Sequence, residues 1–277
     1  MQTPMTGDAD LSGPYQLGEN DRANFARDGF VHLKGVLDGG VVDLYEPEIT
    51  SKVIELNTEH LPLEERSTYG KAFLQVMNLW RHSDIVRDFV FCRRLARIAA
   101  ELLEVRAVRL YHDQALYKEG GGGITPWHVD QYYWPLSSPL TCTAWVPLQD
   151  TPLEMGPLIF AAGTHRNPPE LGLAIGDQSQ EYYTAWVARE DVRVVEEPFD
   201  LGDVSFHCGW ILHRAGVNRT STPRRVMTII YMDADMTVQA PTNDDQYEDL
   251  ELCLPDLKPG ELAASPLNPV LYDSELG

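Results

Sequence analysis

The sequence predicts a mainly β protein with flanking α-helices, of the sandwich or jelly-roll class. Three observations support this prediction. The chain up to Val105 reads mainly as helices, the chain beyond it changes to short β-branched or aromatic runs, and Gly and Pro turns separate these runs. Several short strands without intervening helices favour packed sheets, with the N-terminal helices lying outside them.

Two helices are expected in the N-terminal part. Residues 20–30 (NDRANFARDGF) begin with Asn and Asp and end at a Gly. Residues 83–105 have Ser83 or Asp84 as the N-cap, followed by apolar residues at helical spacing. The Asp84 carboxylate should therefore point at backbone N–H groups, so the His-x-Asp match that it forms with His82 is not expected to bind a metal.

Six strands are expected after these helices. They are AVRLYHDQALYK (107–118), TCTAWVPLQD (141–150), GPLIFAA (156–162), VRVVEEPF (192–199), DVSFHCGWIL (203–212) and RRVMTIIYMD (224–233). Residues 168–192 form a long insertion between two of these strands, and such insertions are functional or mobile. Its Tyr182, Tyr183 and Trp186 suit a lid over an apolar substrate.

Composition limits the classes of partner. The 277 residues carry a net charge of −20, which repels polyanions and argues against nucleic-acid binding. No run approaches the roughly 20 apolar residues of a membrane span, and the first residues lack the regions of a signal peptide. The four cysteines form no C-x-x-C pair, which fits small buried hydrophobes in a reducing cytoplasm. We therefore expect a cytoplasmic monomer or homodimer that acts on a small molecule, with no membrane partner.

The acidic residues are concentrated near the C-terminus. From Asp233 to the end there are 11 acids and one Lys, which give half of the net charge. A solvated, extended segment draped on the domain is the favoured interpretation, and a lid or dimer contact is the alternative. We expect one domain over residues 1–277, divided into a mobile leader (1–18), a helical flank (19–105), a jelly-roll core (106–234) and an acidic, Pro-containing tail (235–277).

The motif TPWHVDQYYWP, residues 125–135, contains a second His-x-Asp pair. In an extended strand residues i and i+2 point the same way, so His128 and Asp130 could supply two adjacent metal ligands. Non-haem iron oxygenases use two His and one carboxylate on one face of the metal. The second His would come from a distant strand, and His165, His207 and His213 are the candidates.

His213 is the strongest of these candidates because an arginine comes shortly after it. It lies where a strand gives way to a turn, and Arg224 opens the next apolar strand. Two adjacent antiparallel strands would bring both side chains to one neighbourhood, where a guanidinium can pair with a carboxylate. A 2-oxo dicarboxylic acid would satisfy both the metal and the arginine.

Other residues near these motifs have simpler interpretations. We expect His165 to be a hydrogen-bonded turn residue, and His207 to be a packing residue or, alternatively, a neighbour of the metal ligands. Arg225 should point to the opposite face from Arg224, as a surface or salt-bridging residue. The GGGG run at 120–123 predicts a flexible turn, since no Lys-Ser/Thr and no helix come after it.

The motifs together resemble the phytanoyl-CoA dioxygenase family of iron(II)/2-oxoglutarate-dependent oxygenases. The similar segments are FARDGFVHLKGVLD, NLWRHSDIVRDF, GGGITPWHVDQYYW, TAWVPLQD, MGPLIFAAGTHR and GDVSFHCGWILHRAGVNRT, followed by PRR. The resemblance implies a double-stranded β-helix (jelly-roll, cupin-like) fold. It implies Fe(II) held by His128, Asp130 and His213, with O2 and 2-oxoglutarate as cosubstrates. It places Arg224 on the C5 carboxylate of 2-oxoglutarate.

The resemblance also points to further cosubstrate contacts. Trp145 and Gln114 occupy positions similar to those that line the cosubstrate pocket. Family members often carry a Ser two residues after the distal His, whereas this chain has Ala215. Either Thr125 or another hydroxyl substitutes for that Ser, or Arg224 holds the carboxylate alone.

The reaction implied is C–H oxidation with release of succinate and CO2. It covers hydroxylation, radical cyclisation, epimerisation and desaturation, whereas the carboxylate of Asp130 disfavours halogenation. The residues Tyr132, Tyr133 and Trp134 either belong to the core or wall the substrate pocket. Similarity to bacterial natural-product tailoring members suggests antibiotic biosynthesis and an uncharged or cationic substrate. The alternatives are an acyl-CoA hydroxylase of the same family and a non-catalytic metal- or ligand-binding jelly roll.

Overall fold

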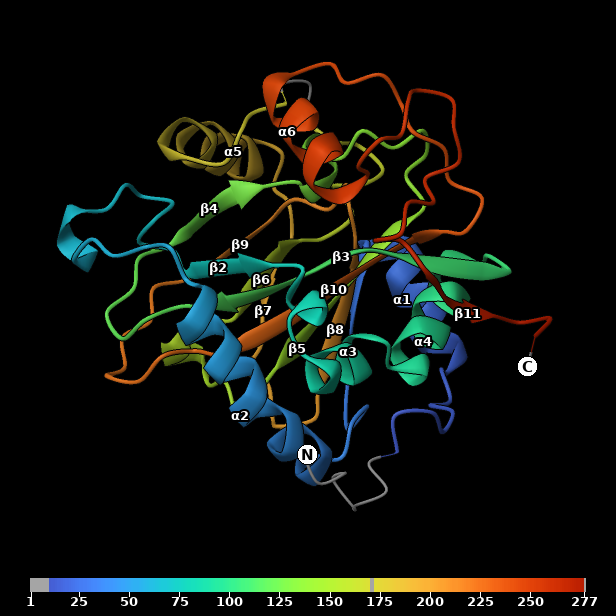
Figure 1. Cartoon of the computed structure of the whole chain (residues 1–277). Helices are drawn as coiled ribbons and strands as arrows, with labels where there is room; N and C mark the ends of the chain where they lie inside the picture. Colours follow the sequence, from blue (N-terminus) through green and yellow to red (C-terminus); the bar gives the residue numbers. More distant parts are fainter. Residues whose placement is uncertain (1–9, 170–171, 277) are drawn as a thin grey trace.

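Two antiparallel sheets pack against each other in the computed structural model, which describes residues 10–169 and 172–276 (Figure 1). The larger sheet has the order β1-β8-β5-β10-β3-β11, and β2 also pairs with β3. Its strands are β1 (Phe30–Leu33), β2 (Leu74–Met77), β3 (Ala107–Tyr117), β5 (Thr141–Pro147), β8 (Val204–Cys208), β10 (Val226–Asp233) and β11 (Val270–Asp273). The smaller sheet has the order β4-β9-β6-β7. Its strands are β4 (Thr125–His128), β6 (Leu158–Ala161), β7 (Val194–Glu196) and β9 (His213–Ala215).

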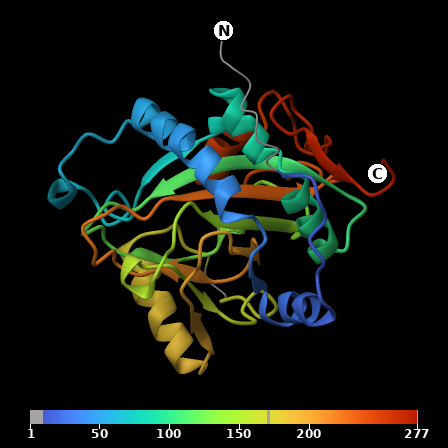
Figure 2. The ribbon, with the colours of Figure 1, turned by 90° about the horizontal axis from the view of Figure 1, so that it is seen from below.

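This arrangement confirms the predicted fold class, and each of the six predicted runs contains a strand. Strand β5 shows why the central runs are so apolar, because every residue from Thr141 to Pro147 is buried. Helices cover the outer face of the larger sheet, and the smaller sheet covers the inner face (Figure 2). A strand enclosed on both faces is expected to be apolar at nearly every position.

The helices are α1 (Glu19–Asp28), α2 (Gly39–Leu56), α3 (Asp84–Val90), α4 (Arg93–Leu103), α5 (Asp177–Arg189) and α6 (Asp244–Cys253). The 3-10 turns are η1 (Leu63–Glu65), η2 (Leu79–Arg81), η3 (Asp130–Tyr132) and η4 (Leu153–Met155). Helices α2, α3 and α4 lie on the side of the larger sheet, whereas α5 lies beside β4 in the smaller one. The helical flank is therefore not purely helical, because β1 and β2 both join the larger sheet.

The single helix predicted over residues 83–105 is wrong, because the chain breaks into α3 and α4 at Phe91 and Cys92. The Cys92 backbone has ψ 107°, which is not helical. Ser83 is the N-cap of α3, and its hydroxyl accepts a hydrogen bond from the Val86 amide at 3.4 Å. Asp84 opens α3, but its exposed carboxylate pairs with Arg87 at 3.1 Å instead of the expected backbone N–H groups, and the cap bond comes from Ser83.

The described part of the leader is fixed to the break between α3 and α4. The Arg94 guanidinium donates to the Gly13 carbonyl at 2.6 Å and pairs with Asp10 at 2.6 Å. The Arg94 amide donates to the Leu11 carbonyl at 3.0 Å. Residues 10–18 are thus docked rather than mobile, and the rest of the predicted leader lies outside the described residues.

The expectation of an extended, solvated tail is also wrong. The segment forms helix α6 and strand β11, and β11 pairs with β3 in the larger sheet. Asn268 joins these elements, because its buried amide donates to the carbonyls of Leu110 at 3.2 Å, Tyr111 at 3.0 Å and Cys253 at 3.2 Å. Counting acidic residues could not reveal this, since the pairing uses the backbone and one uncharged side chain.

The four cysteines are free thiols, and three of them are buried. Over residues 10–169 and 172–276 the structure contains no helix long and apolar enough to cross a membrane.

Replacing Asn268 with Ala should destabilise the protein by roughly 2–4 kcal/mol, because three buried carbonyls lose their donor at once. Urea unfolding would measure the change in the free energy of unfolding. Exposed Asn167 is the matched control, and Asn167→Ala should change stability by less than about 0.5 kcal/mol. Equal stability of the two variants would contradict the assigned role of Asn268.

Candidate functional site

A cavity of about 510 Å³ opens between the two sheets. Its wall combines residues from β2, β3, β4, β5, β9 and α6 with residues 174–175 that precede α5. Eleven residues singled out in the sequence line it: Gln114, Thr125, His128, Asp130, Tyr133, Trp134, Trp145, His207, His213, Ala215 and Arg224.

His128 and His213 face each other across the β4–β9 pair. They are register partners in these antiparallel strands, and their ring centroids lie 4.2 Å apart. Strand β4 ends at His128, and Asp130 begins the turn η3 rather than continuing a strand. The intervening residue, Val129, is still extended, with φ −124° and ψ 130°, so Asp130 and His128 point to the same side.

The three side chains converge on one carboxylate oxygen. Asp130 Oδ1 lies 3.6 Å from His128 Nε2 and 3.7 Å from His213 Nε2. These ligand atoms are close enough to share one metal ion. Two imidazole nitrogens and one carboxylate oxygen form the donor set typical of non-haem Fe(II).

The backbone fixes the tautomer of both histidines. His128 Nδ1 lies 2.8 Å from the Pro126 carbonyl, and His213 Nδ1 lies 3.0 Å from the Ile211 carbonyl. A carbonyl can only accept, so each Nδ1 carries the proton and each Nε2 keeps a lone pair for a metal. Burial lowers the pKa of His128 and lowers the pKa of His213 to about 3, which keeps both rings neutral.

The other oxygen of Asp130 is held by the protein. Oδ2 accepts a hydrogen bond from the Thr143 hydroxyl at 3.4 Å and lies 3.4 Å from His207 Nε2. Burial by itself would raise the pKa of Asp130, but the imidazoles of His213, His207 and His128 lower the pKa below its usual range. The carboxylate is therefore ionised, with Oδ1 turned to the two histidines.

His207 lies beside the ligand cluster, whereas the sequence favoured a packing residue. It contacts Asp130, so the alternative prediction of a neighbour to the ligand cluster is the one that fits. It does not share a strand with His213, because β8 ends at Cys208 and β9 belongs to the other sheet. Between the two strands the chain turns over residues 209–211 and passes to the smaller sheet, which a six-residue spacing alone could not reveal.

A second polar group lies further along the cavity, where Arg224 lines the wall and the buried base Lys118 contacts that wall through Thr125. Arg224 and Lys118 are 1% and 0% exposed, and neither has a carboxylate partner among the described residues. The Arg224 guanidinium donates to the Gly156 carbonyl and lies over the Trp145 ring, 5.3 Å from its centroid. Lys118 Nζ donates to the hydroxyl of Thr125 at 3.3 Å.

The route by which Arg224 reaches the site differs from the prediction. Arg224 is not on a strand adjacent to β9; it forms a backbone bridge with Lys118 just before β10, in line with the larger sheet. It meets the smaller sheet across the cavity, which both Arg224 and Ala215 line. Thr125 is the register partner of Ala215, so a hydroxyl stands directly opposite the position where the expected Ser is missing.

Gly156, whose carbonyl accepts from Arg224, lies against the backbone of Gly216 and has no room for a side chain. It has φ +68°, and a Cβ at this position would lie 2.4 Å from the Gly216 carbonyl oxygen. A glycine is therefore the residue that lets the backbone come close enough to accept from Arg224.

The remaining predicted residues divide between cavity and core. Tyr133 and Trp134 line the cavity, whereas Tyr132 packs in a cluster with Trp127 and Leu212. The Tyr133 hydroxyl accepts a hydrogen bond from the backbone amide of Ile175 at 2.6 Å.

The insertion contributes to the cavity through different residues from those expected. Ala174 and Ile175 line the cavity, whereas Tyr182, Tyr183 and Trp186 pack against β4 from the outside. The predicted lid of three aromatic side chains over a substrate is therefore wrong.

Sequence reasoning missed two parts of the wall. Tyr69 donates to Gln75 at 2.6 Å, and Gln75 donates to Gln114 at 2.6 Å, which forms a polar chain along the cavity. Helix α6 contributes the carboxylates of Asp245, Glu248 and Asp249. The spacing of these acids on one helix face is visible in the sequence, but the cavity beneath them is not.

A family model and a curated protein match parts of this chain. The family model described as phytanoyl-CoA dioxygenase (PhyH) matches residues 25–226. Phytanoyl-CoA dioxygenase domain-containing protein 1 from Danio rerio is 30% identical over 130 residues. That match covers 44% of this chain, and it spans 44% of the curated relative's length.

Solved structures resemble the chain over nearly its whole length. The non-haem α-ketoglutarate-dependent epimerase SnoN from nogalamycin biosynthesis has a TM-score of 0.76 and 28% identity, covering 92% of this chain and 98% of that one. SnoN in complex with Fe3+, α-ketoglutarate and nogalamycin RO has a TM-score of 0.77, with the same identity and coverage. The carbocyclase SnoK from the same biosynthesis has a TM-score of 0.77 over 94% of this chain and 100% of that one, a likeness of fold at 24% identity.

The buried amine of Lys118 should make stability depend on pH. Burial lowers the pKa of Lys118 from 10.5 to about 6, so between these values the unfolded chain binds more protons than the folded one. The free energy of unfolding should then rise with pH by up to ~1.4 kcal/mol per unit across that window. Urea unfolding of the ligand-free proteins should show that, between pH 6.5 and 9.5, the free energy of unfolding of the wild type rises more steeply with pH than that of Lys118→Met. Lys258→Met is the exposed control, and parallel pH profiles for Lys118→Met and the wild type would contradict this expectation.

Proposed function

The chain belongs to the phytanoyl-CoA dioxygenase family, and on this premise we propose that it is an iron(II)- and 2-oxoglutarate-dependent oxygenase. It oxidises a C–H bond of a small-molecule substrate, with O2 consumed and succinate and CO2 released. The observation that carries the proposal is one cavity with two complementary groups. Neutral His128 and His213 converge there with ionised Asp130, and Arg224 lies there as a buried cation without a carboxylate among the described residues.

The donor set fits Fe(II), so His128, Asp130 and His213 are assigned as its ligands. When bound, iron supplies the redox chemistry that activates O2 with 2-oxoglutarate. The protein prepares the ligands in advance, because backbone carbonyls hold both imidazoles with Nε2 free. Thr143 and His207 hold the second oxygen of Asp130, which leaves Oδ1 for the metal.

We assign Arg224 and Thr125 to the C5 carboxylate of 2-oxoglutarate. The missing Ser at position 215 removes a hydroxyl from β9, and Thr125 restores one from the paired strand β4. Lys118 Nζ donates a hydrogen bond to this hydroxyl at 3.3 Å. Trp145 and Gln114 wall the same pocket.

The substrate we propose is an uncharged or cationic natural product. Three α6 carboxylates line the cavity, which makes a polyanionic acyl-CoA an unfavourable occupant. Tyr133 and Trp134 offer aromatic surface to a ring system. An epimerase and a carbocyclase from antibiotic biosynthesis share the fold, so the outcomes proposed are hydroxylation, epimerisation, cyclisation and desaturation.

The domain division that we propose is one oxygenase domain rather than a core with separate appendages. Strands β1 and β11, which lie outside the predicted core in sequence, both pair within the larger sheet. The free cysteines are consistent with action in a reducing cytoplasm.

Alanine at position 128, 130 or 213 should abolish 2-oxoglutarate turnover, because two remaining ligands cannot hold iron in a productive geometry. Succinate release without added substrate measures turnover, and the anaerobic Fe(II)–2-oxoglutarate charge-transfer band measures loading. The second His-x-Asp pair provides the controls, since His82→Ala and Asp84→Ala should retain both signals. Turnover that survives all three ligand substitutions would overturn the proposal.

Removing the Arg224 guanidinium should weaken 2-oxoglutarate binding roughly 10- to 100-fold, the worth of a charge-assisted hydrogen bond. Anaerobic titration of the charge-transfer band in Arg224→Ala measures the Kd. Arg225→Ala is the matched control, because Arg225 pairs with Glu46 and Gln149 away from the cavity. An Arg224→Ala variant with the wild-type Kd would refute the assignment.

A further inference from the structure

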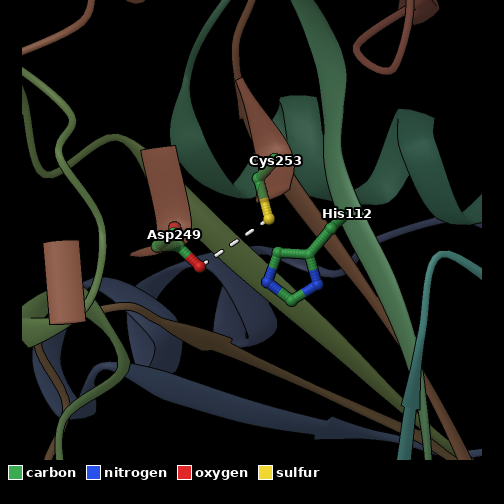
Figure 3. Close-up of side chains that lie close together, drawn as sticks. All are labelled: His112, Asp249 and Cys253. Atoms are coloured by element: carbon green, nitrogen blue, oxygen red, sulfur yellow. Dashed lines mark hydrogen bonds between the residues drawn. The ribbon is translucent and has the colours of Figure 1, made fainter. Parts of the chain in front are cut away.

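A second cluster of metal-ligand side chains lies on the cavity wall, apart from the triad. It consists of His112 on β3 and Asp249 and Cys253 on α6, shown in Figure 3. Their ligand atoms all lie within 4.8 Å of one another. His112 and Asp249 both line the 510 Å³ cavity.

Helix geometry explains how α6 presents two of these groups. Asp249 and Cys253 are four residues apart and therefore project from the same face of the helix. Cys253 Sγ lies 3.7 Å from Asp249 Oδ1, and both side chains turn toward the imidazole of His112 in Figure 3. Asn268 holds α6 against β3 at this point, because its amide donates to the carbonyls of both Cys253 and Tyr111.

The cluster is polar, enclosed and incompletely satisfied. His112 is 3% exposed, and its Nδ1 has no hydrogen-bond partner among the described residues. Asp249 accepts from the Tyr111 hydroxyl but forms no ion pair with a Lys or Arg in the described chain. In Figure 3 the ring nitrogen nearer Asp249 and Cys253 is Nε2, whereas the unpartnered Nδ1 lies on the far side of the ring. The cation is therefore inferred from the three ligand side chains and from the buried carboxylate, which has no basic partner among the described residues.

We propose that His112, Asp249 and Cys253 bind a second divalent metal ion, of the zinc class. One imidazole, one carboxylate and one thiolate are ligands that Zn2+ prefers, and the two anionic groups balance its charge. The Tyr111 hydroxyl orients the carboxylate from outside the cluster. Asp245 and Glu248, on the same helix, line the same cavity and strengthen the attraction for a cation.

This ion would do two things at the cavity. It would join α6 to β3 and so fix the helix that closes one wall. Three protein ligands also leave a coordination position open, and the cavity is where an oxygen atom of water or of a substrate hydroxyl could fill it. The inference does not depend on the proposed function, because it shares no ligand with His128, Asp130 and His213.

Cobalt(II) titration of the metal-free full-length protein tests the proposal. Only a thiolate ligand gives an intense near-ultraviolet sulfur-to-cobalt charge-transfer band, and the triad contains no sulfur, so the band reports the second site alone. The wild type should bind two Co2+ per chain and show the band. Cys253→Ser should bind one Co2+ and lose the band. Asp249→Asn should lower the affinity of the second site for Co2+ at least 10-fold.

The controls separate this site from the triad and from misfolding. Asp130→Ala should lose one Co2+ yet keep the band, whereas Cys142→Ser, which changes a buried thiol elsewhere, should keep both. Zn2+ should raise the melting temperature of Asp130→Ala but not of Asp130→Ala/Cys253→Ser. A wild type without the thiolate band, or a band unchanged in Cys253→Ser, would overturn the proposal.

Discussion

The pairing of β4 with β9 is the constraint on which the rest of the site depends. This short antiparallel ladder places His128 opposite His213 and Thr125 opposite Ala215. A one-residue shift in register would turn each side chain to the other face of the sheet. The cluster of His128, Asp130 and His213 and the Thr125 hydroxyl beside Lys118 would then be lost together, so both ends of the cavity depend on one strand pair.

The same cavity separates charge along its length. At one end an ionised carboxylate is held by neighbouring donors, and at the other Arg224 and Lys118 are buried without a carboxylate among the described residues. Burying a positive charge without a partner is costly, so burial lowers the pKa of Arg224 to about 9, which leaves it charged, and the pKa of Lys118 to about 6, which leaves its amine neutral at pH 7. A dianionic cosubstrate would pair with the buried Arg224, so its binding should stabilise the folded protein.

Helix α6 closes one side of the cavity with acidic residues. The sheets supply a scaffold of the same fold as an epimerase and a carbocyclase, and α6 adds three carboxylates to the wall of the cavity. Its position relies on Asn268 and on β11, elements from the far end of the chain. Substrate preference in such a fold is decided by the segments that surround the common core.

The sequence by itself determined the local features whose causes are local. The spacing of His128 and Asp130, the cap at Ser83 and the apolar runs of β5 and β10 arise from strand and helix periodicity and could be predicted. Tertiary structure decided the rest, because it depends on contacts between segments far apart in the chain. The placement of His207 and His213 on different sheets and the hydroxyl of Thr125 opposite Ala215 arise from backbone pairing, and the docking of α6 onto β3 adds side-chain bonds from Asn268, far along the chain. Backbone hydrogen bonds form with almost any side chain, so these pairings leave no pattern in the residues that form them.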